Sequence, residues 1–521
     1  MKICFINPPY TQSILDNNEY DPYKPNIQSP GLGYLAASIE REGHSVTVLE
    51  CPANQWDLIR LCQHLENNKY DAYGLSILYT TLLCAAKIAR LIRKRCFDTF
   101  IFAGGIYPSI YPEDTLDVIP ELDCCVIGDG EEILTELMLA ANGGIQIDNI
   151  RGVAYRKNGK FVITPPFISQ KSLDDLPYPK ISYMNSSGTF GIVSSRGCYG
   201  SCTFCASNTY KRLRPGPLVK CRSCKNIIGE LEWLIKEYHA KNFIFFDDNF
   251  LYHFCDPDFM REFSHLIHKK ALSFHFQITA RADDIIRYSQ YLDVLIGLGL
   301  DMVFTGVESF VPRQLDLFRK GVTAEKNIQA IQILKEKGIP FSLGLILFDP
   351  YTTIDELIYN IDVLLELEYY NTDYAGAFPV SLNDPLKVVK GSPIYFDFLQ
   401  KGLLKNNENG YDFIHKKTER FYDCLNNWRK KIQAAAEKYY LTYKAHKQGI
   451  HELAFHLLNE KKKLMELDML CFRRIAQLCA TEMGTGEIMK IIEREYLNDL
   501  LSIEQTFKKA EYALEQPDKR C

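Results

Sequence analysis

Short apolar runs alternate with amphipathic segments in two long stretches of this 521-residue chain, and this alternation restricts the fold more than any other feature. In residues 1–145 the apolar runs are KICFIN, VTVLE, DAYGLSI, FIFAGG and CCVIGDG. Helical patterns such as LGYLAASIEREG and AAKIARLIRKRC lie between them. β-Rich runs that are each followed by a helix-length segment indicate βα units around a parallel sheet. We therefore expect an α/β protein with a Rossmann-like, flavodoxin-like first domain.

The second stretch, residues 189–385, contains six further candidate strands, which are GIVSSRG, NFIFFDD, FHFQITA, MVFTGVES, FSLGLILFD and YAGAFPV. Polar residues stand at the end of each strand. Barrels built from βα units carry their sites at this end of the strands. A chain of this length is too long for one core, so the two stretches are expected to form separate domains.

Two segments lack this alternation. Residues 146–188 are expected to be a connector, which begins with a β-hairpin in RGVAYRKNGKFVITPP because Asn-Gly favours a tight turn. Residues 386–521 are expected to form a helical domain. Its clearest apolar stripe repeats every three or four residues, and Lys461–Lys463 are expected on the solvated face beside it. The stripe consists of Leu464, Leu467, Cys471, Ile475 and Leu478.

Three of the 17 cysteines form a C-x3-C-x2-C motif, namely Cys198, Cys202 and Cys205. Three thiolates bind three irons of a cubane iron–sulfur cluster and leave the fourth iron open to a small molecule. The alternative is that the three cysteines are incidental core residues. Cys221 and Cys224 form a second C-x2-C, but no second pair or nearby His completes a four-ligand set, so we interpret them as structural.

Composition excludes several classes of function. The net charge of −5 gives no indication of nucleic acid or an anionic membrane as a partner. No apolar run reaches the roughly 18 residues that a membrane span needs. The start, MKICFINPPY, predicts a first strand and not a signal peptide. Many scattered cysteines, odd in number, favour the reducing cytoplasm.

The cysteine motif resembles that of the radical S-adenosylmethionine (SAM) enzymes, and the resemblance implies a partial (β/α)6 barrel of TIM type over residues 189–385. Phe204 matches the aromatic residue that this family places near the adenine. Polar residues at three strand ends match positions that bind the rest of SAM. FFDDNF would hold the amino group, ITARADD the carboxylate, and Gly-Val-Glu-Ser the ribose or methionine part. The residues implied are Asp247, Asp248, Arg281, Glu308 and Ser309.

The first domain resembles the cobalamin-binding domain that precedes the barrel in one subclass of these enzymes. NPPY, GLGYLAASIEREGH, AGGIYP and GDGEE carry the resemblance. The subclass usually has Gly-Glu-Gly-Glu where this chain has Gly128–Glu131, and often a His at Tyr107. No D-x-H-x2-G motif surrounds His44 or His64, so we expect cobalt without a protein His ligand. The implied cobalamin contacts are Pro8, Pro9, Gly31, Ser76, Gly104, Gly105, Tyr107, Gly128, Gly130 and Glu131.

The resemblance implies three cofactors: a [4Fe-4S] cluster, SAM and cobalamin. The implied chemistry is reductive cleavage of SAM to a 5′-deoxyadenosyl radical, followed by methylation of an unactivated carbon. A rearrangement or cyclisation without methyl transfer is an alternative, and a non-catalytic metal-binding scaffold is another. The expected partners are a small-molecule or peptide substrate and an external electron donor such as flavodoxin or ferredoxin.

Overall fold

The structure is a computed structural model that describes residues 1–9, 27–169, 171–184, 188–212, 216–371, 382, 385–405 and 410–515. The chain divides into two compact units. The first contains Met1–Gly200, Cys205–Thr279 and Gly297–Gly299. The second contains Ser201–Phe204, Ala280–Ile296 and Leu300–Cys521.

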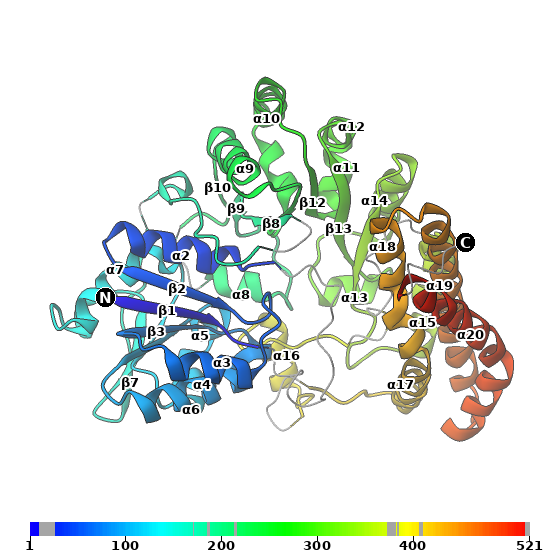
Figure 1. Ribbon diagram of the computed structural model, residues 1–521. Helices are drawn as coiled ribbons and strands as arrows, with labels where there is room; N and C mark the ends of the chain where they lie inside the picture. Colours follow the sequence, from blue (N-terminus) through cyan, green and yellow to red (C-terminus); the bar gives the residue numbers. More distant parts are fainter. Residues whose placement is uncertain are drawn as a thin grey trace. The chain divides into compact units, whose positions relative to one another are not determined.

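The first unit begins with a seven-stranded sheet in the order β2-β1-β3-β4-β5-β6-β7 (Figure 1). Its first five strands are parallel, and the order 2-1-3-4-5 is the flavodoxin-like order. The α/β fold expected for the first domain is therefore confirmed. The strands are β1 (Lys2–Asn7), β2 (Ser45–Glu50), β3 (Ala72–Ser76), β4 (Phe100–Gly104), β5 (Cys124–Val126), β6 (Val153–Lys157) and β7 (Lys160–Ile163).

Helices cover both faces of this sheet because successive side chains of each strand point to opposite faces. Ile3 and Phe5 of β1 pack with helices α2 (Pro30–Arg41) and α7 (Gly130–Ala141). Cys4 and Ile6 pack on the other face with α3 (Leu58–Asn67) and α4 (Leu82–Arg95). Strands buried on both faces explain why the apolar runs of this domain are nearly continuous.

The hairpin predicted in residues 146–188 is present as β6 and β7. Asn158 and Gly159 both have positive φ, at 52° and 77°, as a two-residue type I′ turn requires. β6 pairs antiparallel with β5, so the hairpin forms the edge of the first sheet. Part of the segment expected to be a connector therefore belongs to the first sheet.

Three parallel strands of the second sheet begin in the first unit, namely β8 (Thr189–Ile192), β11 (Asn242–Phe245) and β12 (His275–Arg281). A short antiparallel pair, β9 (Ser195–Arg196) and β10 (Lys220–Cys221), follows β8. Helices α9 (Cys224–Tyr238) and α10 (Phe259–Lys269) alternate with these strands along the chain.

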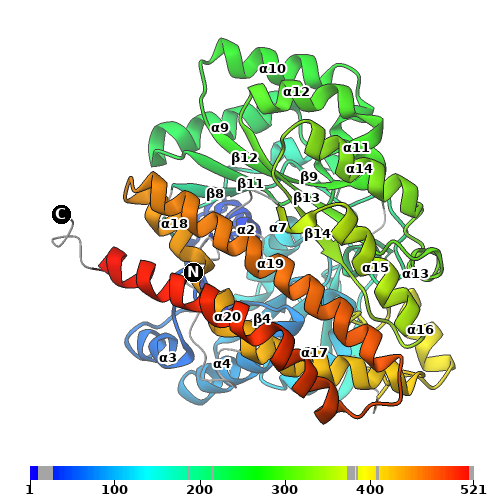
Figure 2. The ribbon, with the colours of Figure 1, turned by 90° about the vertical axis from the view of Figure 1, so that its right-hand side faces the viewer.

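The second unit contains the next two barrel strands, β13 (Leu300–Glu308) and β14 (Phe341–Leu345), which are parallel (Figure 2). Helices α14 (Ala324–Glu336) and α15 (Ile354–Glu366) follow them in turn. The strand and helix alternation expected for the barrel is therefore present. The sixth expected strand, YAGAFPV at 374–380, lies outside the described residues.

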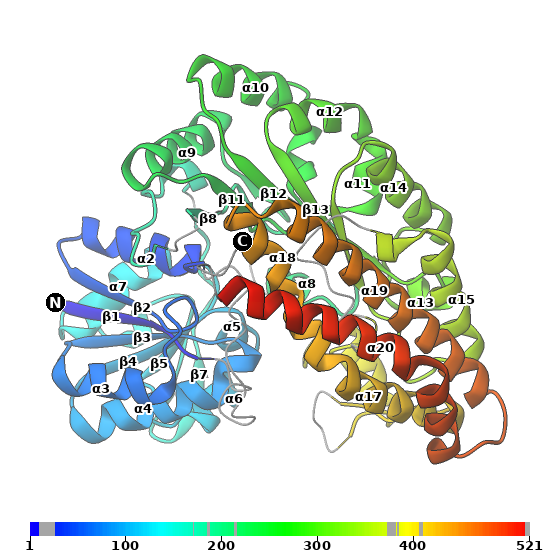
Figure 3. The ribbon, with the colours of Figure 1, turned by 45° about the vertical axis from the view of Figure 1, so that its right-hand side comes forward.

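The C-terminal region is helical, as expected, and its long helices pack side by side (Figure 3). All five residues of the predicted apolar stripe are buried. The prediction for Lys461 was wrong, because this residue is fully buried on the same helix. No helix in the described part of the chain is long and apolar enough to cross a membrane. The helices are α17 (Lys416–Ala436), α18 (Tyr440–Lys447), α19 (His451–Cys479) and α20 (Thr485–Glu515).

Candidate functional site

The cysteine motif lies on an irregular loop between β9 and α8 (Ala206–Arg212). Gly197 starts the loop with φ of 98°, and a Cβ there would lie 2.2 Å from the carbonyl oxygen of Leu218. Only glycine fits this position, so the turn into Cys198 depends on it. Cys202 is buried, whereas Cys198 and Cys205 are partly exposed.

The loop provides a donor set that fits an iron–sulfur cluster. Among the residues that the structure describes, no three His, Cys, Asp or Glu side chains converge on one metal ion. A cubane cluster does not need such convergence, because each thiolate binds a different iron. Three thiols carried by one irregular loop are consistent with that requirement.

The second pair of cysteines, Cys221 and Cys224, does not share one environment. The Cys224 thiol is buried and donates to the Phe259 carbonyl, while Cys221 is exposed.

Residues 201–204 of this loop contact other residues of the second unit. The Thr203 amide donates to the Phe318 carbonyl at 2.9 Å, and its hydroxyl donates to the Leu317 carbonyl at 2.7 Å. The Phe204 ring lies edge-on to the Phe318 ring with centroids 5.4 Å apart. Phe204, expected near the adenine, therefore also anchors the loop.

A buried lysine that sequence reasoning missed faces Glu308 at the end of β13. The ammonium of Lys320 donates to Oε1 of Glu308 at 2.7 Å, and both side chains are almost fully buried. Burial alone would lower the pKa of Lys320, but the charges of Glu308 and Cys202 outweigh it, so the pKa is raised. Glu308 has φ of 66°, a strained conformation of the kind that proteins retain at functional sites.

Arg281 and Ser309 already have partners within the second unit. The Arg281 guanidinium forms two bonds to Asp283, at 2.9 and 3.2 Å, and donates to the Lys320 carbonyl at 3.0 Å. The buried hydroxyl of Ser309 donates to Gln314 at 2.6 Å. Ser309 thus stabilises the turn after β13, and Arg281 positions the backbone of Lys320.

The two aspartates after β11 differ in exposure. Asp247 is buried and accepts bonds from the Ser194 amide at 2.8 Å and the Ser195 hydroxyl at 2.7 Å. This carboxylate ties the end of β8 to β11. Asp248 is exposed and accepts a bond from Ser207 on α8 at 2.9 Å. Asp248 is therefore the more accessible of the two predicted acceptors for an ammonium group.

The predicted cobalamin residues gather at one edge of the first sheet, because the carboxyl ends of parallel strands meet there. Pro8 and Pro9 follow β1, Ser76 ends β3, and Gly104 ends β4. Gly105 has φ of 105°, with its Cβ position 3.0 Å from the Ile77 carbonyl. The remaining predicted residues lie near the starts of the helices that follow this edge or in the turn before one of them. Tyr107 is in the short helix α5 (Ile106–Ile110), Gly128 is in the turn between β5 and α7, Gly130 and Glu131 are in the first turn of α7, and Gly31 is in the first turn of α2.

In the described part of the chain, the same edge carries an apolar surface. Leu78 and Ile106 are more than a third exposed, and Tyr79 is 61% exposed. His44 immediately precedes β2 and lies near the N-terminal amine, so it is at the opposite edge. His64 is on α3 and contacts Tyr70, which precedes β3.

Glu50 is a buried carboxyl group at this edge that sequence reasoning missed. It ends β2, accepts a bond from the Asn7 amide group at 2.8 Å, and accepts another from the Ser29 amide at 3.1 Å. Burial raises its pKa to about 7, although these two bonds lower it in part. A charged residue at the end of an apolar strand was the only signal in the sequence.

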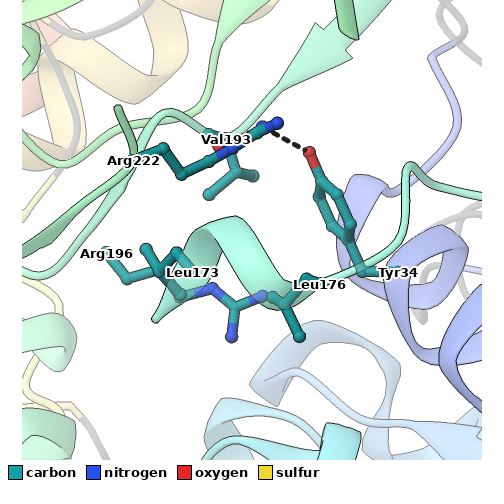
Figure 4. A pocket seen from close by; sticks show the side chains of 6 residues that line it. All are labelled: Tyr34, Leu173, Leu176, Val193, Arg196 and Arg222. Carbon is teal, nitrogen blue, oxygen red and sulfur yellow. Dashed lines mark hydrogen bonds between the residues drawn. The ribbon is translucent and has the colours of Figure 1, made fainter. Parts of the chain in front are cut away.

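A small cavity beside the start of the cluster loop is lined by two arginines (Figure 4). Arg222 donates to the Tyr34 hydroxyl at 3.1 Å and pairs with Glu230 at 2.6 Å, and Tyr34 donates to Glu230 at 2.9 Å. Burial raises the pKa of Tyr34 and of Glu230. This closed network joins α2 of the first sheet to α9. Arg196 also lines the cavity, with its own carboxylate partners.

Two family models match separate parts of the chain. Residues 22–138 match the family model of the B12 binding domain, and residues 192–363 match that of the Radical SAM superfamily. An uncharacterized methyltransferase of Pyrococcus horikoshii is 26% identical over 358 residues, which cover 67% of this chain and 76% of the relative.

Two further matches extend the comparison. The anaerobic magnesium-protoporphyrin IX monomethyl ester cyclase of Synechocystis is 25% identical over 387 residues, covering 72% of this chain and 73% of the relative. The solved structure of the cobalamin-dependent S-adenosylmethionine radical enzyme OxsB, with aqua-cobalamin and S-adenosylmethionine bound, has a TM-score of 0.72. It is 16% identical, and the match covers 99% of this chain and 80% of that chain.

Proposed function

Because the chain belongs to the cobalamin-dependent radical SAM enzymes, we propose that it transfers a methyl group to an unactivated carbon of a small-molecule or peptide substrate. Its cofactors are a [4Fe-4S] cluster, SAM and cobalamin. When bound, the cluster and SAM supply a 5′-deoxyadenosyl radical, and cobalamin supplies the methyl group. A radical is needed because no side-chain base can deprotonate such a carbon.

The proposal of methyl transfer rests on the edge of the first sheet where the carboxyl ends of its parallel strands meet. Leu78, Tyr79 and Ile106 would hold cobalamin against an apolar surface at this edge. Cobalamin held there would supply the methyl group. The similarity to the uncharacterized methyltransferase of Pyrococcus horikoshii supports the same reaction.

The proposed roles of the remaining residues follow from their chemistry. Cys198, Cys202 and Cys205 would bind three irons of the cluster. Asp248, the accessible carboxylate, would accept bonds from the SAM ammonium. Glu308 and Lys320 form a buried ion pair beside Cys202 and would bind polar groups of SAM. An external one-electron donor and a cytoplasmic location complete the proposal.

Ring closure without methyl transfer is the second candidate, because the cyclase of Synechocystis matches a similar share of the chain. The two reactions differ before any substrate is known. We would incubate the reconstituted, reduced protein with SAM that carries a trideuterated methyl group. Methyl transfer predicts labelled methyl on protein-bound cobalamin without added substrate. Abundant 5′-deoxyadenosine with no label on cobalamin would contradict methyl transfer and favour the second candidate.

A further inference from the structure

A bidentate ion pair between Arg196 and Glu131 joins the strand before the cluster loop to the B12 binding domain. The guanidinium of Arg196, the residue before Gly197 and Cys198, donates to Glu131 at 2.6 Å from Nη2 and at 3.3 Å from Nη1. Nη1 also lies 3.6 Å from a carboxylate oxygen of Asp129. The side chain of Arg196 is 18% exposed and that of Glu131 is 8% exposed. Two parallel bonds from a planar guanidinium fix both distance and orientation.

The same short segment also contacts the helix after the cluster loop. The Tyr210 hydroxyl, on α8, donates to Asp129 at 3.4 Å. Residues 128–131 therefore bond both flanks of the loop, before Cys198 and after Cys205. The segment connects β5 to α7 at the edge where cobalamin is expected, and Glu131 lies in the first turn of α7, where a carboxylate is favoured.

We infer that Arg196 and Glu131 are positioning residues that couple cobalamin binding to the order of the cluster loop. The inference rests on the proposed cluster ligands and cobalamin edge. A cofactor that restrains residues 128–131 restrains Arg196 through the ion pair, and thereby the turn into Cys198. Coupling between two sites is reciprocal, so a filled cluster loop favours cobalamin binding to the same degree.

Hydrogen exchange measures this coupling directly. Anaerobic protein with the cluster reconstituted is labelled with and without hydroxocobalamin, and exchange is followed in peptides from residues 197–212. We expect cobalamin to slow exchange of these amides at least threefold in the natural protein. In Arg196→Lys, which changes no expected cobalamin contact, we expect no such slowing although cobalamin still binds as judged by its absorbance. In Glu131→Gln, which also alters an expected cobalamin contact, we expect no slowing even at a cobalamin concentration at which the absorbance shows full binding.

The matched control is Glu230→Gln, which weakens another buried Arg–Glu pair of the same unit that does not touch residues 128–131. It should keep the cobalamin-dependent slowing even if its melting temperature falls. Equal slowing in Glu131→Gln and the natural protein would overturn the inference, as would loss of slowing in Glu230→Gln.

If a single variant fails to fold, the double variant Arg196→Glu with Glu131→Arg must restore the slowing. A natural protein that binds no cobalamin at all would instead contradict the proposed function.

Discussion

At the scale of single residues, the sequence indicated several buried charged residues but not the ion pairs that they form. Lys320 is twelve positions from Glu308, and Arg196 is 65 positions from Glu131. Neither pair has a local pattern, because contacts between distant segments leave no periodicity in the sequence. The candidate cluster cysteines, by contrast, form a local spacing because all three lie within one loop, and their role stays a prediction.

Replacing Lys320 by Met should weaken both stability and SAM binding. Glu308 would remain buried without its cation, and loss of one partner of a buried pair costs about 3–5 kcal/mol. We expect SAM affinity to fall at least tenfold, measured by equilibrium dialysis. Lys335→Met is the control, because its pair with Glu368 is exposed and such pairs contribute about 0–1 kcal/mol. Unchanged SAM affinity in Lys320→Met would contradict the proposed role.

Glu50 should make the stability of the protein depend on pH. Its pKa is about 7 in the folded protein against 4.5 ordinarily, so between these values the folded state binds more protons than the unfolded state. The free energy of unfolding therefore falls as pH rises through this window, by up to about 3 kcal/mol. Glu50→Gln should remove this fall and be the more stable variant at pH 8, as measured by urea unfolding. The exposed Glu66→Gln should behave like the natural protein.

At the scale of secondary-structure elements, the turns and stripes were predictable where one physical rule decides them. The Asn158-Gly159 turn needs positive φ at both residues, and the stripe of α19 follows helical periodicity. Lys461 was placed wrongly because its helix is buried on more than one side, which the period of 3.6 does not reveal. The hairpin was found, but its pairing with β5 could not be predicted from its own residues.

The loop that carries the cysteines depends on Gly197. In Gly197→Ala the new Cβ would collide with the Leu218 carbonyl, so the turn between β9 and Cys198 must shift. We expect the variant to retain less than a third of the iron of the natural protein after anaerobic reconstitution. Gly159→Ala also replaces a glycine of positive φ but meets no atom within 4 Å, so iron should be retained. Full iron content in Gly197→Ala would show that the turn is not required.

At the scale of the whole molecule, the order of domains was predictable and the substrate was not. Strand and helix alternation together with short motifs in each domain was enough to predict a B12 binding domain and a radical SAM domain. The domain boundaries remain predictions, because the two compact units of the structure have different boundaries from the predicted domains. No motif in the C-terminal helices indicates a substrate, since their residues mainly satisfy packing against one another.

The most direct test is to measure iron and cobalt in the same anaerobically purified and reconstituted protein, beside a Cys198→Ala, Cys202→Ala, Cys205→Ala variant. We predict about four irons and one cobalt per chain in the natural protein. The variant should lose its iron and keep its cobalt, because the three cysteines lie outside the residues that match the B12 binding domain. Iron retained by the variant would contradict the proposed cluster ligands. Natural protein with iron but no cobalt would contradict the cobalamin-dependent function.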